Sequence, residues 1–201
     1  MPVAVPSSAL IGGRLSLDFA NELGLSSDFS WEVLLRFLLD TRIISPERSS
    51  RLLALPQIDP QSSDALLGKA QRLHASLQQV FGALLQKEAI LREWVEPINE
   101  VLRITEGHDE LLLQGDVWGL DFVASEGGLD WLLAAIARSA AEIIAEGPGV
   151  RLRICSNPAC GLLFYDTSRT RRRRWCSMSR CGNRHKVAAF SRRHSVSRHA
   201  H

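Results

Sequence analysis

The four cysteines of the chain fall within one short stretch and constrain its fold more than any other feature. Two close pairs are separated by a loop in the pattern C-x4-C-x15-C-x4-C, formed by Cys155, Cys160, Cys176 and Cys181. This spacing is typical of zinc sites, because each pair supplies two thiolates from one tight turn and together they complete a tetrahedron. We therefore predict one structural Zn²⁺ with four protein ligands and no open position for a catalytic water.

Other uses of four cysteines fit the sequence less well. Disulfides need an oxidising compartment, which nothing in the chain indicates, and the C-x-x-C spacing of a redox motif is absent. An iron–sulfur cluster also takes four thiolates, but two evenly matched pairs favour zinc. His185 follows Cys181 by one helical turn and is an alternative ligand in its place.

The residues around the cysteines predict a small treble-clef-like finger. Asn157, Pro158 and Gly161 supply turn residues for a metal knuckle. The flanking segments "VRLRI" and "LLFY" predict a β-hairpin with this knuckle at its tip, and a helix is expected after Cys176 with Cys181 in its first turn. Such a module is too small for a substantial core, so metal binding is expected to supply about 10 kcal/mol or more of its folding free energy.

Charge is segregated along the chain. Residues 1–150 carry 11 Lys+Arg and 21 Asp+Glu, whereas residues 151–201 carry 13 Lys+Arg and the single acid Asp166. Net charges of −10 and +12 indicate an acidic body joined to a basic module that suits a polyanion. We place the boundary at the "EGPG" segment, which predicts residues 1–149 as a regulatory domain, 150–194 as the finger and 195–201 as a basic disordered tail.

The basic residues divide into two groups by position. The loop between the cysteine pairs is expected to clamp phosphates, and the following helix is expected to read a groove. Arginine outnumbers lysine by 12 to 1 in residues 151–201, and its planar fork suits phosphate or guanine. Some of these cations, with Arg151 and Arg153, would also offset the charge of a zinc–thiolate centre. The candidate nucleic-acid contacts are Arg169, Arg171, Arg172, Arg173 and Arg174 in the loop, then Arg180, Asn183, Arg184, His185, Lys186, Arg192 and Arg193.

The first 150 residues predict a mostly helical domain with a small antiparallel β element, which makes the whole chain α+β. Alternating residues 15–20 predict a strand, residues 110–125 a strand pair around Gly115-Asp116, and residues 92–104 helical pieces broken near Pro97. Apolar periodicity predicts helices over residues 30–44, 45–55, 62–89 and 129–144. Asp18 and Asn21 are candidate ligand-binding residues, and the alternative for Asp18 is a bond to local backbone N–H groups.

Two segments resemble known families. "CGLLFYDTSRTRRRRWCSMSRCGNRHK" resembles the CGNR zinc finger, whose signature is Cys181 to Arg184 here. "GGRLSLDFANE" resembles the opening of the ABATE domain, which accompanies that finger in bacterial proteins proposed to be stress-induced transcription regulators; Glu22 stands where that family has threonine. The resemblance implies that the four cysteines bind zinc, that the finger binds DNA, and that the N-terminal domain senses a signal.

These observations predict a zinc-dependent DNA-binding transcription regulator, with RNA as the alternative partner. One finger reads few base pairs, so a homodimer is expected, and a small-molecule effector is possible. Catalysis is not expected, because no phosphate loop, HExxH motif or nucleophile elbow is present. Without an apolar stretch that could cross a membrane or a secretory signal, the expected location is the cytoplasm, at the nucleoid. The opposite charges also suggest that the acidic body masks the finger.

Overall fold

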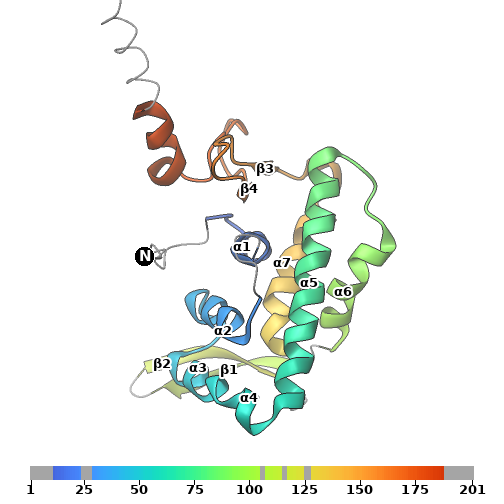
Figure 1. Cartoon of the computed structure of the whole chain (residues 1–201), viewed down its shortest axis with the longest axis vertical. Helices are drawn as coiled ribbons and strands as arrows, with labels where there is room; N and C mark the ends of the chain where they lie inside the picture. The colour runs from blue at the N-terminus through green and yellow to red at the C-terminus, as the bar shows by residue number, and fades with distance from the viewer. Residues whose placement is uncertain (1–10, 24–28, 105–106, 115–116, 125–127, 188–201) are drawn as a thin grey trace, which may run out of the picture.

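The computed structural model describes residues 11–23, 29–104, 107–114, 117–124 and 128–187. These residues form a helical body, a long β-hairpin at one end of it and the cysteine-rich finger at the other (Figure 1). The mostly helical fold with a small antiparallel sheet confirms the predicted class. The elements are α1 (Leu15–Leu23), α2 (Trp31–Asp40), α3 (Pro46–Leu53), α4 (Leu55–Ile58), α5 (Pro60–Gln86), α6 (Arg92–Ile104), β1 (Gly107–Gln114), β2 (Val117–Ala124), α7 (Trp131–Ala145), β3 (Leu152–Ile154) and β4 (Leu163–Tyr165).

Helix α5 runs the length of the body, about 40 Å for its 27 residues. The Asp59 side chain caps its start by accepting the Ser62 N–H at 3.1 Å, and Pro60 occupies the first turn, where it needs no hydrogen-bond donor. Lys87 ends the helix in the left-handed conformation. The predicted apolar stripe is buried against α1, α2, α6 and α7, and it includes Leu66, Ala70, Leu73, Leu77, Val80 and Phe81.

Helix α7 follows its prediction closely, whereas α6 corrects one. Leu132, Leu133 and Ile136 of α7 are fully buried, as the periodicity predicts. The sequence predicts a break near Pro97, but α6 is continuous through it. Proline removes a single i→i−4 bond there, and the burial of the next residue, Ile98, opposes that loss. None of the helices in the described part of the chain is both long and apolar enough to cross a membrane.

The N-terminal segment also corrects a prediction, because residues 15–20 form helix α1 and not a strand. The chain turns at Gly13, which has a φ of +74°, and the Leu17 N–H then donates to the Arg14 carbonyl at 3.0 Å. Helix α1 packs against α5, α7 and β4 at once. A helix that is enclosed on several sides lacks the single apolar stripe that identifies an amphipathic helix. Over so few residues, alternating apolar and polar side chains then resemble the pattern of a strand.

The β1–β2 hairpin is confirmed where the sequence predicts it. Its strands pair antiparallel, with Leu111 opposite Leu120 and Gln114 opposite Val117. This register leaves a two-residue connection, as expected for a tight hairpin; Gly115-Asp116 itself lies outside the described residues. The hairpin lies at the end of α5 opposite the finger (Figure 1).

Strands β3 and β4 form the hairpin of the finger and rest on the helical body. β4 packs against α1 and β3 against α5. Leu152 of β3 and Tyr165 of β4 belong to the core of the body, whereas Phe164 points into a separate small cluster that contains the cysteines. The finger hairpin thus has one face toward the body and one toward its own cysteine site. The boundary between the two predicted domains, at residues 149 and 150, stays a prediction.

Candidate metal centre and basic surface

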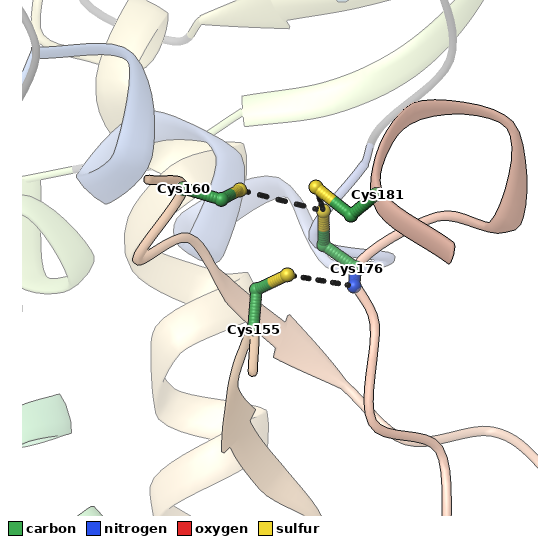
Figure 2. Close-up of side chains that lie close together, drawn as sticks. All are labelled: Cys155, Cys160, Cys176 and Cys181. Carbon is green, nitrogen blue, oxygen red and sulfur yellow. Dashed lines mark hydrogen bonds between the residues drawn. The ribbon is translucent and has the colours of Figure 1, made fainter. Parts of the chain in front are cut away.

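The first cysteine pair is positioned by the tip of the β3–β4 hairpin. Cys155 follows β3 directly, and its N–H donates to the Leu162 carbonyl at 2.9 Å, which closes the hairpin. Cys160 ends a turn in which its own N–H donates to the Asn157 carbonyl at 2.9 Å. The next residue, Gly161, has a φ of +64°, a conformation that favours glycine. The predicted knuckle is therefore present, with both thiols on its inner side (Figure 2).

The second pair is positioned by a helical turn. Ser177 caps it, with its hydroxyl accepting the Arg180 N–H at 3.3 Å. The turn Met178–Gly182 is a π-helix that continues as helix through residue 187, so Cys181 lies in the first turn as predicted. A Cβ on Gly182 would lie 2.5 Å from the Met178 sulfur, which explains why the smallest residue follows Cys181.

The four thiols converge on one point (Figure 2). Their Sγ atoms all lie within 4.8 Å of one another. The Cys176 sulfur is 3.7 Å from that of Cys160 and 3.8 Å from that of Cys181. A tetrahedral zinc centre with Zn–S bonds near 2.3 Å has sulfur–sulfur edges of about 3.8 Å, so the site fits this ion. Among the described residues, His185 does not join this group of potential ligands.

Burial and hydrogen bonds set the protonation of these thiols. Burial raises the pKa of Cys176, and the neighbouring Cys160 and Cys155 thiols raise it further. Burial also acts to raise the pKa of Cys155, but backbone N–H donors from Cys176 and Asn157 outweigh it and lower that pKa. The Asn157 side-chain amide donates to the Cys181 sulfur at 3.4 Å. Amide groups thus approach the sulfurs where the sequence suggested arginines.

Asp166, the single acid of the basic region, organises the arginine loop from a fully buried position. It accepts the Ser168 N–H at 2.9 Å, the Arg173 N–H at 3.0 Å and the Arg153 guanidinium at 3.1 Å. Burial alone would raise the pKa of Asp166, but these donors hold it below its usual range. Arg153 therefore forms an ion pair with Asp166.

In the predicted phosphate clamp, four arginines are exposed, whereas Arg173 is half-buried and bonds to the finger itself. Arg173 donates from Nε to the Trp175 carbonyl at 2.8 Å and from Nη2 to the Cys176 carbonyl, and its guanidinium lies 4.9 Å from the centre of the Phe164 ring. Arg173 therefore holds the loop against the second cysteine pair. The loop arginines that are exposed are Arg169, Arg171, Arg172 and Arg174.

The predicted groove-reading residues lie on the turn and helix after Cys176. His185 rests on the Trp175 ring with their centres 4.7 Å apart, and the Arg174 guanidinium lies 5.3 Å from the same ring. Arg180 is half-buried, whereas Asn183, Arg184, His185 and Lys186 are exposed. Arg192 and Arg193 lie outside the described residues, so their contribution stays a prediction.

Asp18 and Asn21, the candidate ligand residues, both contribute to contacts between the N-terminal segment and the finger. The Asn21 side chain donates to the Leu163 carbonyl and accepts the Leu163 N–H, each at 2.8 Å. Asp18 accepts the Gly12 N–H at 2.8 Å, and the Gly12 carbonyl in turn accepts the Tyr165 N–H at 2.7 Å. The bond from Gly12 to Asp18 is the local backbone contact that the sequence offered as the alternative for this residue. The bonds of Asn21 to Leu163 of β4 could not be predicted, because nothing in "LDFAN" indicates a partner about 140 residues away.

Comparison with known families agrees with this geometry. The family described as "Putative stress-induced transcription regulator", ABATE, matches residues 13–147, which is more than half of the chain. The chain belongs to the ABATE family. The CGNR zinc finger matches residues 151–194, so both predicted resemblances are confirmed in the predicted order. No curated protein matches the chain.

The ABATE and CGNR regions meet without covering the basic loop. Residues 151–194 are a zinc finger whose four thiols form one site, which confirms the predicted cofactor, one zinc ion. The contact with the ABATE helices is made by β3 and β4, on the other side of the finger from the helix after Cys176 (Figure 1). Charge opposition predicts masking of the finger, but Arg169, Arg171, Arg172 and Arg174 stay exposed beside the docked body.

Proposed function

We propose that this protein is a transcription regulator whose zinc-bound CGNR finger contacts DNA through its arginine loop. The observation that carries the proposal is a loop with four exposed arginines that is held at both ends. The Ser168 N–H donates to Asp166 at its start, and Arg173 near its end donates to Asp166 and to the Cys176 carbonyl. Clustered cations on a fixed surface gain by meeting phosphates, because counterions are released on contact. A rigid arrangement also loses little conformational entropy when it binds.

Cys155, Cys160, Cys176 and Cys181 are the proposed zinc ligands. When bound, the ion ties the hairpin knuckle to the turn before the helix, which keeps the loop between them in place. The knuckle supplies two thiolates and the capped turn supplies two, and the N–H donors of Cys176 and Asn157 reduce the charge that these thiolates carry. Four protein ligands leave no position for a catalytic water, so we assign the site a structural and not a catalytic role.

Binding of duplex DNA as a function of salt tests the proposal. We expect about five phosphate contacts, so the logarithm of the binding constant should fall with the logarithm of salt at a slope of about −4.5. The double variant Arg172→Ala/Arg174→Ala should reduce that slope by about 2, whereas Arg51→Ala/Arg92→Ala, which removes the same charge from exposed sites on the body, should not. An equal effect of both pairs would show that net charge, and not this loop, governs binding.

A competition experiment separates DNA from RNA. Labelled duplex DNA bound to the finger is challenged with unlabelled duplex DNA or with structured RNA of equal length and charge at one salt concentration. Stronger competition by DNA is expected from this proposal. Stronger competition by RNA would move the assignment to the alternative, an RNA-binding finger.

The ABATE region has the regulatory role in this proposal, at the nucleoid in the cytoplasm. One short helix and one loop read few base pairs, so we expect two copies on a specific site. Light scattering of the protein with DNA that carries one or two half-sites measures this. A single copy on every specific site would remove the dimer from the proposal and leave the DNA contact intact.

A further inference from the structure

A pocket lies where the ABATE helices meet the finger. Its volume is about 380 Å³, and it is referred to below as the interdomain pocket. One wall comes from α1 and α5, with Ala20, Asn21, Gln78 and Gly82, and the opposite wall comes from the finger, with Cys160 and Leu162. Pockets of small molecules commonly occupy such junctions, and this volume is within their usual range of about 300–1,000 Å³.

The lining of the interdomain pocket defines the chemistry of its occupant. None of the described residues that line it is an acid, lysine, arginine or histidine, although charged residues are common in the chain as a whole. Leu85, Ile154, Leu162 and Leu163 make most of the wall apolar. An anionic ligand would lose hydration here without gaining a cationic partner, and it would face the Cys160 thiolate of the zinc-bound finger, so the pocket suits a neutral molecule.

Two side-chain amides supply the polar part of the lining. The Gln78 amide nitrogen donates to the Ala20 carbonyl at 2.6 Å, and the Asn21 amide is joined to Leu163. Each amide group has two donor hydrogens and two acceptor lone pairs, so both retain hydrogen-bonding capacity beyond these contacts. A ligand with one hydrogen-bonding group and an apolar remainder matches this arrangement.

Small residues keep the pocket open. A Cβ added to Gly82 of α5 would meet no atom within 4 Å, so the fold has room for a side chain there. Glycine in a helix interior costs about 1 kcal/mol of stability relative to alanine, so Gly82 does not stabilise α5. A larger residue at position 82 would occupy the pocket without disturbing the helix. This gives a direct way to close it.

We propose that the interdomain pocket is the effector site of this protein and binds a neutral, mostly apolar small molecule with one hydrogen-bonding group. Such a ligand contacts α1 and α5 on one side and the zinc knuckle on the other, so it binds the docked finger better than a displaced one. Its binding therefore stabilises the contact between Asn21 and β4. This inference deepens the proposed function by naming the class of signal, but binding to the pocket does not require DNA.

The zinc-loaded full chain tests the site with a panel of neutral amides: acetanilide, benzamide and caprolactam. Backbone amide NMR shifts are followed during titration. At least one probe is expected to cause saturable shifts at residues 82, 161 and 162, with a dissociation constant of about 1 mM for molecules of about ten non-hydrogen atoms. Benzoate, which has a shape close to that of benzamide but carries a charge, should bind at least tenfold more weakly.

The variant Gly82→Leu fills the pocket and Gly68→Leu is its matched control, because Gly68 lies on the same helix outside the lining and also has room for a side chain. The shifts should disappear in Gly82→Leu and persist in Gly68→Leu, while both variants remain at least as thermally stable as the parent. Shifts that persist in Gly82→Leu, equal binding of benzoate, or no saturation by any probe up to about 10 mM would each overturn the proposal.

This experiment is independent of nucleic acid. Pocket binding without DNA affinity would refute the proposed function and leave the pocket as a ligand site. DNA affinity without pocket binding would refute only the effector site. A saturating probe should also slow the transfer of zinc to a chelator in the parent protein and have no effect on that rate in Gly82→Leu.

Discussion

Neighbouring arginines in the basic loop have different roles. Arg173 has three partners within the finger, the carbonyls of Trp175 and Cys176 and the ring of Phe164, whereas the Arg172 side chain is exposed. Replacing Arg173 with alanine leaves two backbone carbonyls without their donor, and this should destabilise the finger by about 1–3 kcal/mol. We expect Arg173→Ala to speed zinc transfer to a chelator.

Arg172→Ala is the matched control for that measurement. It removes the same charge from the adjacent position but no hydrogen bond or ion pair among the described residues of the finger, so its chelation rate should equal that of the parent. Its effect should instead appear in the salt dependence of DNA binding. If the two variants lose zinc at the same rate, Arg173 does not have the structural role that its contacts indicate.

His74 gives the body a dependence on pH. Its ring contacts Phe19 and Phe29, and its Nε2 lies 3.2 Å from the Ala20 carbonyl. Burial lowers the pKa of His74 below its ordinary value of 6.5, and the hydrogen bond to Ala20 opposes this only in part. The unfolded chain therefore binds a proton that the folded chain resists, so stability falls as the pH decreases through about 6.5.

Denaturant unfolding between about pH 7 and pH 5.5 measures this effect. His74→Gln keeps a donor for Ala20 but does not titrate, so its stability should fall less with decreasing pH than that of the parent. The comparison isolates His74, because weaker zinc binding at low pH affects both proteins alike. His185→Gln, which changes an exposed imidazole, should follow the parent. Parallel curves for His74→Gln and the parent would contradict the assignment.

The sequence predicted single residues well where one chemical rule decides and poorly where partners are distant. Four thiols at zinc spacing predicted a metal site, because ligand chemistry and turn geometry are local. The distinct role of Arg173 could not be predicted, because "RRRR" contains no signal for which guanidinium points inward. The same applies to Asn21, whose partner Leu163 is brought close only by the fold.

At the scale of elements, a side chain of helix α1 bonds to the backbone of β4 in the place that a further strand of the small sheet would take. The Asn21 amide exchanges two hydrogen bonds with Leu163, as a neighbouring strand would. Asn21→Leu keeps the volume but leaves the Leu163 N–H and carbonyl without these partners. We expect a loss of about 1–3 kcal/mol in the contact between α1 and β4.

Hydrogen exchange measures that contact directly. The Leu163 amide should exchange roughly tenfold or more faster in Asn21→Leu, which corresponds to about 1.4 kcal/mol at 25 °C. Gln78→Ala removes a nearby exposed amide that bonds Ala20 and not the strand, so Leu163 should retain its protection there. Unchanged exchange in Asn21→Leu would show that packing alone holds the strand.

Elements with a single buried face were predictable, and the others were not. The stripes of α5 and α7 repeat every three or four residues over many turns, which identifies them. Helix α1 is enclosed on several sides and is short, so its pattern was interpreted as a strand. Helix α6 contains Pro97, and local propensity predicted a break that the burial of Ile98 and Val101 opposes.

At the scale of the molecule, the finger and the body share part of one core. Leu152 and Tyr165 come from the finger hairpin but pack with the helices. The Tyr165 hydroxyl donates to Glu146, and the Arg14 guanidinium lies 4.8 Å from the centre of the Tyr165 ring. The segregated charges of the sequence predicted two modules, whereas this shared packing depends on tertiary contacts that charge does not report. Because the side chains of Leu152 and Tyr165 belong to the core of the body, unfolding of the finger should lower the stability of the body as well.

Metal removal measures this coupling. Treatment with a chelator should release the knuckle and withdraw Leu152 and Tyr165 from the helical core, which loses a few kcal/mol of burial. We expect the melting temperature of the helical signal to fall by about 5–10 °C, while most of the helical circular dichroism at room temperature remains. Readdition of zinc should restore the melting temperature, and Cys176→Ser should resemble the chelated protein with or without zinc. If the melting temperature of the chelated parent equals that of the zinc-bound form, the finger and the ABATE body are energetically independent despite their contact.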